Sequence, residues 1–199
     1  HFGDTLEGKT VAVSGFGNVS WGTITKLVEL GAKPITISGP DGYILDEEGI
    51  TTPEKIDMLL WLRANSPMAC APYVEKFPNA KFIPGKRPWE VKADLYMPCA
   101  MQNDITLDWA KEMVKNGAIY LIEGANMPST NEAIAYLQEN GVVVGPSKAA
   151  NAGGVACSCL EMAQNAEHLI WSKERGYEEL EGIMVHIFEI TEAACTKYD

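Results

Sequence analysis

The chain has 199 residues, 46% of them hydrophobic and 22% charged, which suits one large globular domain and is short for two. Its net charge of −11, with no basic cluster to offset it, argues against nucleic acid or an anionic membrane surface as a partner. The sequence has neither an apolar run near the ~20 residues of a membrane span nor a secretory signal, so we expect a cytoplasmic protein.

Residues 8–42 predict a strand, a glycine turn, a helix and a second strand, in that order. The β-branched run Thr10–Ser14 is typical of a strand buried on both faces, and the turn Gly15–Asn18 follows it directly. The helical pattern ends at Gly31, and Pro34–Ser38 is extended again. Backbone N–H groups at the start of a helix after closely spaced glycines bind a diphosphate, so this unit predicts a dinucleotide site.

The glycine turn departs from the usual dinucleotide fingerprint at its third position, where Ser20 replaces glycine. Serine is small enough for the helix and the strand to pack closely. A plain tight turn has similar glycines, but the position of this turn between a buried strand and a helix favours cofactor binding. We therefore expect Gly15 and Gly17 to approach a cofactor.

Residues 39–90 give weaker signals. We expect a small hairpin in which Tyr43–Leu45 turns back at Asp46–Gly49, because turn residues are frequent there. Pro53 after Thr52 predicts the first turn of a helix. The prolines of residues 66–90 indicate an irregular excursion with one or two helical turns.

Residues 93–144 predict three further strands that alternate with two helices. The strands are 94–97, 118–122 and 142–144, and the helices are 106–115 and 130–140. This alternation predicts an α/β fold, a Rossmann-like doubly wound sheet that is mostly parallel, with helices on both faces. A helical segment follows from Asn151, with these core candidates: Leu160, Ala163, Ile170, Ile183, Ile187 and Ile190.

Ligands of an open parallel sheet bind outside the carboxyl ends of its strands. The loops expected there are 15–18, 38–42, 98–103, 124–128 and 145–154. Taken singly, Asn103, Asn126 and Asn151 are typical turn or cap residues. Together with Gln102, however, they place neutral amides at three separate strand ends, which suits a nicotinamide ribose and carboxamide.

The adenosine ribose of the cofactor is expected at the end of the second strand, around Ser38–Asp41. A carboxylate there accepts hydrogen bonds from the ribose hydroxyls and repels a 2′-phosphate. The strand itself ends on Ser38 or Gly39, whereas Asp41 comes later and is also a typical turn residue. The nearest cation, Lys33, precedes the strand at its wrong end. These residues favour NAD as cofactor and leave NADP possible.

No general acid, general base or metal site is evident in these loops. Lys148 is placed either to approach the cleft or to remain a surface residue, and Cys157-Ser158-Cys159 lacks the second ligand cluster that a zinc site needs. The five scattered cysteines are typical of reduced thiols. A nicotinamide cofactor itself supplies the chemistry of hydride transfer, so such a site needs no protein nucleophile. We expect no metal site here, and we expect the general base and the substrate clamp to lie elsewhere.

Five motifs resemble those of hexameric bacterial glutamate dehydrogenases, within the wider Glu/Leu/Phe/Val dehydrogenase family. They are G-F-G-N-V at 15–19, S-G-P-D-G-Y-I at 38–44, P-C-A-M-Q-N at 98–103, A-N-M-P-S-T-N-E-A at 125–133 and P-S-K-A-A-N-A-G-G-V at 146–155. The resemblance implies that residues 1–199 are the cofactor-binding domain, without the family's substrate domain and last helix. The start at His1 rather than Met also suggests a piece of a longer protein.

The resemblance further implies a homohexameric parent that converts L-glutamate, water and NAD(P)+ to 2-oxoglutarate, ammonia and NAD(P)H. The family's catalytic lysine and aspartate belong to the absent domain, so the chain alone is expected to be inactive. The implied cofactor contacts are Gly15, Phe16, Gly17, Asn18, Val19, Ser38, Gly39, Pro40, Asp41, Ala100, Gln102, Asn103, Asn126 and Asn151. The implied substrate contacts are Val155 and Ser158, with Ser158 at the distal carboxylate.

Cofactor preference is affected by two departures from the NADP-dependent members of the family. Where those relatives tend to have a serine and a polar run, this chain has Phe16 and Gly39-Pro40. An apolar ring and a proline leave few donors for a 2′-phosphate. The resemblance therefore strengthens the preference for NAD.

Two other functions remain open. A leucine, phenylalanine or valine dehydrogenase shares the two-domain plan, but Ser158 suits a distal carboxylate and not an apolar side chain. A non-catalytic NAD-sensing module needs only about 140 residues of this fold. Such a module has no need for the substrate-facing segment 146–158.

Overall fold

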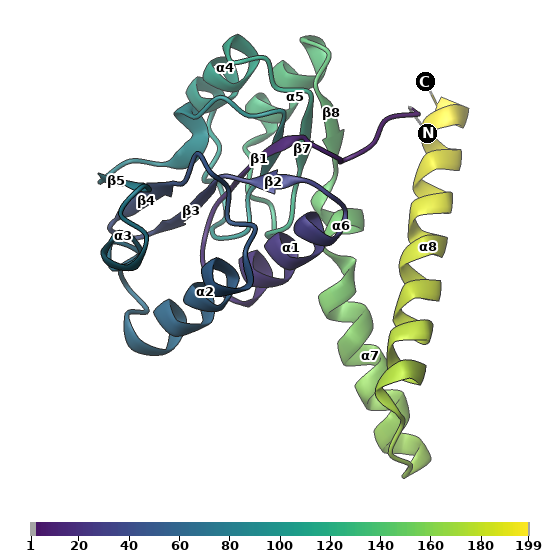
Figure 1. Cartoon of the computed structure of the whole chain (residues 1–199). Coiled ribbons are helices and arrows are strands. Elements are labelled where there is room, and N and C mark those ends of the chain that lie inside the picture. Colours follow the sequence, from purple (N-terminus) through teal and green to yellow (C-terminus); the bar gives the residue numbers. More distant parts are fainter. Residues whose placement is uncertain (1–2, 199) are drawn as a thin grey trace.

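Eight strands form two sheets in the computed structural model, which describes residues 3–198 (Figure 1). The main sheet is parallel throughout, in the order β2-β1-β6-β7-β8. Its strands are β1 (Thr10–Val13), β2 (Lys33–Pro34), β6 (Leu95–Met97), β7 (Tyr120–Ile122) and β8 (Val143–Gly145). An antiparallel sheet contains β3 (Thr36–Gly39), β4 (Gly42–Leu45) and β5 (Lys81–Pro84). The predicted α/β class with a mostly parallel sheet is confirmed.

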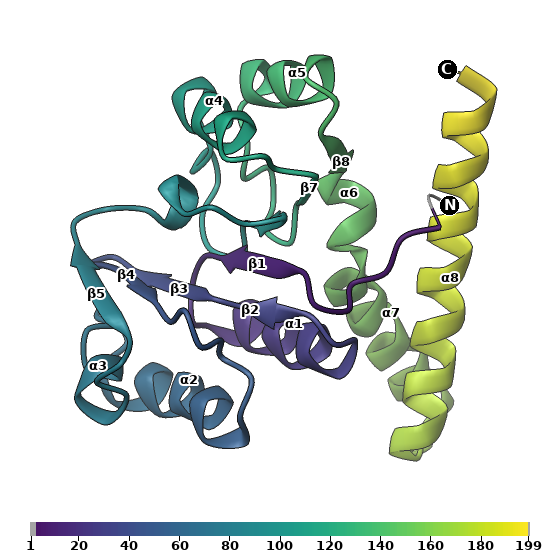
Figure 2. The same ribbon diagram turned by 45° about the horizontal axis from the view of Figure 1, so that its top comes forward.

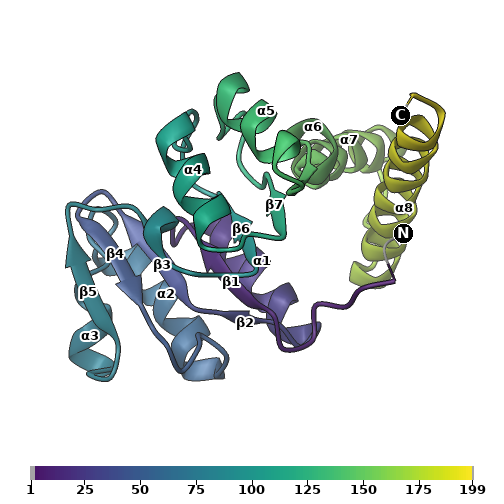
Figure 3. The same ribbon diagram turned by 90° about the horizontal axis from the view of Figure 1, so that it is seen from above.

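Helices cover both faces of the main sheet (Figure 3). They are α1 (Asn18–Glu29), α2 (Pro53–Asn65), α3 (Tyr73–Lys76), α4 (Leu107–Lys115), α5 (Asn131–Glu139), α6 (Ser147–Ala150), α7 (Ala152–Glu167) and α8 (Lys173–Tyr198). α1 and α2 pack on one face, where Ile24 and Leu59 join Val11 and Val13 in one core. α4 and α5 pack on the other face, around Leu121. Because both faces are covered, Val11, Ala12 and Val13 of the interior strand β1 are fully buried, as the sequence predicts.

Side-chain caps explain where two of the helices begin. The Oγ1 atom of Thr52 accepts a hydrogen bond from the Lys55 N–H at 3.3 Å, at the start of α2. The Oγ1 atom of Thr130 accepts one from the Ala133 N–H at 3.3 Å, at the start of α5. α1 ends before Gly31, whose φ of +81° is a conformation that glycine adopts readily. These three predicted helix boundaries are confirmed.

The second predicted strand, 34–38, is divided between the two sheets. β2 pairs with β1 over only two residues. Thr36 then replaces a backbone partner: its Oγ1 accepts from the Val13 N–H at 2.8 Å and donates to the Val13 carbonyl at 2.9 Å. Since one hydroxyl satisfies both polar groups of Val13, the backbone of β3 is free to pair with β4.

The predicted hairpin turn at Asp46–Gly49 is wrong, because the hairpin turns at Gly39–Gly42 instead. Gly42 has a φ of +150°, and a Cβ atom there would meet the Ile83 carbonyl oxygen of β5, so this crowded position requires glycine. The buried carboxylate of Asp46 pairs with the Lys55 ammonium at 2.8 Å. Asp46 therefore anchors α2 rather than a returning strand.

Residues 66–90 contain more regular structure than their prolines predict. α3 provides one short helical turn, β5 follows it, and a 3-10 helix, η1 (Pro88–Glu90), leads to β6. β5 lies at the edge of the antiparallel sheet, where a proline such as Pro84 is tolerated. The sequence signal for β5 is weak because its pairing partner β4 is distant along the chain.

α7 and α8 form a helical pair that stands away from the sheet (Figure 2), so the predicted helical C-terminal segment is confirmed. Its predicted core does not form in full. Leu160, Ile183 and Ile187 are half-buried, but Ala163, Ile170 and Ile190 are exposed. Two helices that pack mainly on each other cover only one stripe of each, which leaves the other apolar positions open. Among residues 3–198, no helix is long and apolar enough to cross a membrane.

Candidate functional site

The turn at the end of β1 is tightly packed against its neighbours. Gly15 has a φ of +84°, and a Cβ atom there would lie 2.5 Å from Ser20 Oγ and 3.3 Å from Ala100 Cβ. The Gly15 N–H donates to Ser38 Oγ at 3.0 Å. Conformation and space both require glycine at this position, and the turn is fixed to the end of β3.

Ser20 shows why the third fingerprint glycine is not needed. Its side chain is buried, and its hydroxyl donates to the Ser14 carbonyl at 2.9 Å. The small hydroxyl lies against Gly15 and satisfies a backbone carbonyl where the helix crosses the strand end. A larger side chain would push α1 away from β1.

Gly17 differs from Gly15 in its surroundings. No heavy atom lies within 4 Å of where its Cβ atom would be, so the backbone is open on that side. Gly17 is the N-cap residue of α1, and among the described residues no side chain caps this helix. The first N–H groups of a helix have no partners within it, so α1 presents free donors and the positive end of its dipole at the strand ends. Phe16 beside it is buried, whereas Val19 is half exposed.

The Gly39–Gly42 turn places a carboxylate where the strand end lacks one. A Cβ atom on Gly39 would lie 2.6 Å from Asp41 Oδ1 and 2.9 Å from the Phe16 ring. No acidic side chain fits at position 39, because the Asp41 carboxylate takes that volume. Both oxygens of Asp41 accept from the Cys70 N–H, at 2.9 and 3.0 Å, and Oδ2 also accepts from the Ala71 N–H at 3.1 Å. These bonds fix the carboxylate beside the turn.

Two buried thiols lie next to these loops. Burial, followed by the neighbouring Asp41 carboxylate, raises the pKa of Cys70 to about 12. Burial raises the pKa of Cys99 to about 11. Both groups therefore remain thiols at neutral pH, and neither has the thiolate character of a nucleophile.

Hydrogen bonds join the remaining strand-end loops. The Asn151 side-chain amide donates to Asn126 Oδ1 at 2.7 Å and to the Ala125 carbonyl at 3.1 Å. The Asn103 N–H donates to the Met127 carbonyl at 3.0 Å, with Asn103 in the left-handed conformation. The loops after β6, β7 and β8 thus meet at one edge. Ala100, Gln102, Asn103 and Asn126 are exposed there.

The predicted substrate contacts lie on α7. Val155 and Ser158 are three residues apart in the helix, and both are exposed. The Ser158 hydroxyl donates to the Gly154 carbonyl of its own helix at 3.3 Å. Both side chains are therefore accessible to a ligand.

Sequence reasoning missed Glu123, which follows β7 and is 2% exposed. Its Oε2 atom accepts from the Ser147 N–H at 3.1 Å, while Oε1 is buried without a partner in the described part of the chain. Glu123 thereby holds the start of α6, the segment that leads to Asn151. An acidic residue directly after an apolar strand and before Gly124 was the available signal.

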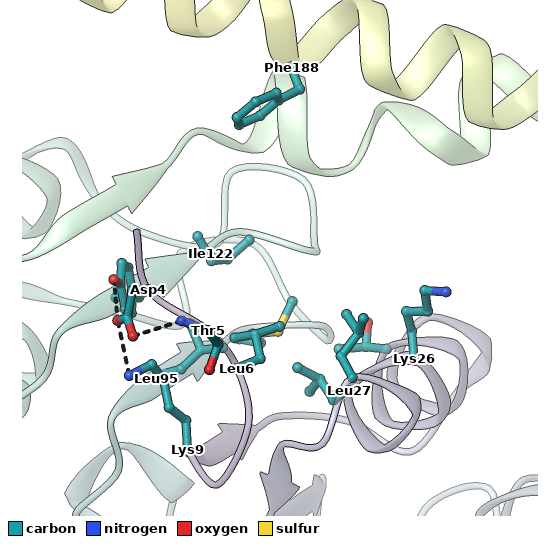
Figure 4. Close-up of a pocket in the computed structure, with 13 residues that line it drawn as sticks. Asp4, Thr5, Leu6, Lys9, Lys26, Leu27, Leu95, Ile122 and Phe188 are labelled. Atoms are coloured by element: carbon teal, nitrogen blue, oxygen red, sulfur yellow. Dashed lines mark hydrogen bonds and ion pairs between the residues drawn. The ribbon is translucent and has the colours of Figure 1, made fainter. Parts of the chain in front are cut away.

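A large groove lies elsewhere, on the α1 side of the sheet (Figure 4). It measures about 560 Å³ and is largely apolar, with Leu6, Leu27, Leu95, Ile122 and Phe188 among its lining residues. It contains none of the glycine turns or amides of the strand-end loops. The groove and the strand-end loops are therefore two separate candidate sites.

Comparison with known proteins agrees with the motifs at the strand ends. Residues 1–199 match the family model described as Glutamate/Leucine/Phenylalanine/Valine dehydrogenase. The chain belongs to this dehydrogenase family. It is 52% identical to an NAD-specific glutamate dehydrogenase of Clostridium symbiosum, covering 100% of the chain and 44% of that relative. It is 45% identical to an NADP-specific glutamate dehydrogenase of Haemophilus influenzae, covering 98% of the chain and 42% of that relative.

Solved structures of family members have the same fold. A glutamate dehydrogenase with 52% identity aligns with a TM-score of 0.93, over 98% of this chain and 43% of its own. The glutamate dehydrogenase of Plasmodium falciparum, with 42% identity, aligns with a TM-score of 0.90 over 96% of this chain and 40% of its own. The chain thus spans less than half the length of the relatives it matches.

Substitution of the two glycines of the turn should have unequal effects on stability. We expect Gly15→Ala to lower the free energy of unfolding by about 2 kcal/mol or more, because it combines a left-handed backbone with a close contact. Gly17→Ala should change it by less than about 1 kcal/mol, because the space is open and the φ of −81° is allowed. Urea denaturation of the two variants measures both values. Equal losses would contradict the geometry of the turn.

Proposed function

We propose that this chain is the nicotinamide-cofactor-binding domain of a glutamate dehydrogenase, and that the substrate domain lies outside residues 1–199. The observation that carries the proposal is the uncapped N-terminus of α1, open past Gly17. Backbone N–H groups and a helix dipole at such an opening favour a diphosphate. In this proposal Gly15, Gly17, Asn18 and Val19 form the diphosphate site.

The adenosine ribose would lie at Ser38–Asp41 in this proposal, with Phe16 beneath the turn. The Asp41 carboxylate is fixed next to Gly39, Phe16 is apolar, and Pro40 has no N–H to donate. A 2′-phosphate would meet a negative charge and few donors there. NAD is therefore the preferred cofactor, and NADP remains possible because relatives are named NAD-specific, NADP-specific and NAD(P)-specific.

The nicotinamide end would lie along the loops after β6, β7 and β8. The exposed residues Ala100, Gln102, Asn103 and Asn126 line this edge, and Asn151 is bonded to Asn126. Amide groups orient a carboxamide and ribose without adding charge. When bound, the cofactor accepts the hydride, and these residues position it.

The reaction that we propose for the full-length protein is the oxidative deamination of glutamate that the family resemblance implies, and its relatives are named glutamate dehydrogenases. L-Glutamate, water and NAD(P)+ give 2-oxoglutarate, ammonium, NAD(P)H and a proton. The Ser158 hydroxyl would hydrogen-bond the distal carboxylate of the substrate. Val155, one turn earlier on α7, would contact the substrate. The residues that activate water and move protons would belong to the substrate domain. A cytoplasmic homohexamer is proposed from the family resemblance alone.

Cofactor titration tests the binding proposal. We expect the chain to bind NADH about tenfold more tightly than NADPH, because the 2′-phosphate lacks donors and meets Asp41. Gly17→Ala should weaken both cofactors, because its methyl group fills the space where the diphosphate approaches. Fluorescence titration measures the dissociation constants, and an unchanged unfolding midpoint shows that the variant is folded. Tighter binding of NADPH than of NADH would contradict the assignment of NAD as the preferred cofactor. Binding of neither cofactor would contradict the proposed function.

Glutamate oxidation tests the division of labour between the two domains. We expect the chain alone to produce no NADH from L-glutamate and NAD+, because half of the substrate clamp is absent. Absorbance at the NADH band measures this directly. Turnover by the chain alone would refute the proposal that catalytic residues lie outside it. Turnover with leucine or valine and not glutamate in the full-length protein would favour the alternative substrate class.

A further inference from the structure

An arginine that the sequence does not associate with the cofactor reaches the adenosine end of the site. Arg87 lies between β5 and η1, and its Nη1 donates to the Gly39 carbonyl at 3.2 Å. Its Nε atom lies 3.3 Å from Asp104 Oδ1, with side-chain exposures of 31% for Arg87 and 5% for Asp104. The guanidinium therefore links two segments that are far apart in sequence.

These two segments belong to opposite sides of the proposed cofactor cleft. Gly39 is in the turn that would receive the adenosine ribose. Asp104 directly follows Asn103, in the loop that would meet the nicotinamide side, and its Oδ2 also accepts from Trp89 Nε1 at 3.2 Å. Trp89 is fully buried in the core beneath this loop. Arg87 and Asp104 thus connect the Gly39 turn to Trp89 in the buried core.

The charge balance argues against a second role for Arg87 as a ligand of a 2′-phosphate. The buried Asp104 carboxylate neutralises the guanidinium, and the Asp41 carboxylate lies on the other side of Gly39. Burial raises the pKa of Asp104, while Arg87 opposes that shift and favours the charged form. A neutral pair supplies geometry rather than net positive charge.

We propose that Arg87 is a positioning residue for the adenosine half of the cofactor. By donating a hydrogen bond to the Gly39 carbonyl and forming an ion pair with the Asp104 carboxylate, it fixes the ribose turn relative to the opposite loop. The proposal rests on the cofactor function proposed above. Arginine suits this task because its planar fork presents several donors in fixed directions, which lysine lacks. Removal of the guanidinium leaves the turn free to move and raises the entropic cost of binding.

The test compares NADH with ADP-ribose, which lacks the nicotinamide. We expect Arg87→Met to raise the dissociation constants of both ligands about tenfold, because the charge-assisted hydrogen bond to the Gly39 carbonyl is lost. Lys86→Met is the matched control: it removes a cation from the neighbouring position, where the ammonium pairs with Glu90 and is 57% exposed. It should change both affinities by less than about twofold. Titration calorimetry gives the dissociation constants, and thermal unfolding shows which variants are folded.

A second variant covers the case in which Arg87→Met leaves a buried charge and fails to fold. Arg87→Met with Asp104→Asn removes both charges, and should fold yet still bind about tenfold more weakly than the unmodified chain. Unmodified affinity in this double variant would overturn the proposal, because Arg87 would then only neutralise Asp104. Asp104→Asn alone should also weaken the binding of NADH and ADP-ribose. Tighter binding of NADPH by this Asp104→Asn variant would show instead that Arg87 is a phosphate ligand. If the unmodified chain binds neither ligand, the proposed cofactor function fails first.

Discussion

The backbone at Gly15 leaves little room for a side chain, because a Cβ atom there would lie 2.5 Å from Ser20 Oγ and 3.3 Å from Ala100 Cβ. This close approach brings the end of β1, the start of α1 and the loop after β6 to one point. The position of α1 follows from it, and so does the direction in which the free N–H groups of that helix point. The other strand-end loops are arranged around this contact.

Side-chain hydroxyls extend the contact from one strand to the next. Ser38 Oγ accepts from the Gly15 N–H at 3.0 Å, and Ser14 Oγ accepts from the Cys99 N–H at 3.0 Å. The Ala125 N–H donates to the Pro98 carbonyl at 2.8 Å, which adds the loop after β7. Each bond satisfies a backbone group that no strand partner reaches. The edge is therefore ordered before any ligand arrives, which reduces the entropic cost of binding one.

Local sequence signals predicted the parts of the fold that depend on neighbouring residues. The turn at Gly15–Asn18 and the caps at Thr52 and Thr130 are examples, since each needs only a few consecutive residues. The Gly39–Gly42 hairpin is local, but the turn residues at Asp46–Gly49 gave a competing turn signal. β5 was not predicted, because its pairing with β4 joins residues about 40 positions apart. The same reason hid Arg87, whose two partners come from distant loops.

In the candidate site, too, the sequence predicted the features that have a local pattern and missed those that depend on distant residues. The motifs named the asparagines of the strand-end loops in advance, and the structure brings Asn126 and Asn151 into contact. Glu123 was not predicted, because its place after an apolar strand does not show that its partner is the Ser147 N–H, 24 positions along the chain. The exposed apolar positions of α7 and α8 were assigned to a core because helical periodicity shows which residues share a face, but not what covers it.

We propose that a nicotinamide cofactor binds at the strand ends around the glycine turn and not in the large apolar groove. Amide chemical shifts of the isotopically labelled chain, recorded during titration with NADH, distinguish the two locations. We expect the largest changes at residues 15–19, 38–41, 99–103 and 124–126. Changes concentrated instead at Leu6, Leu27 and Phe188, which line the groove, would contradict it.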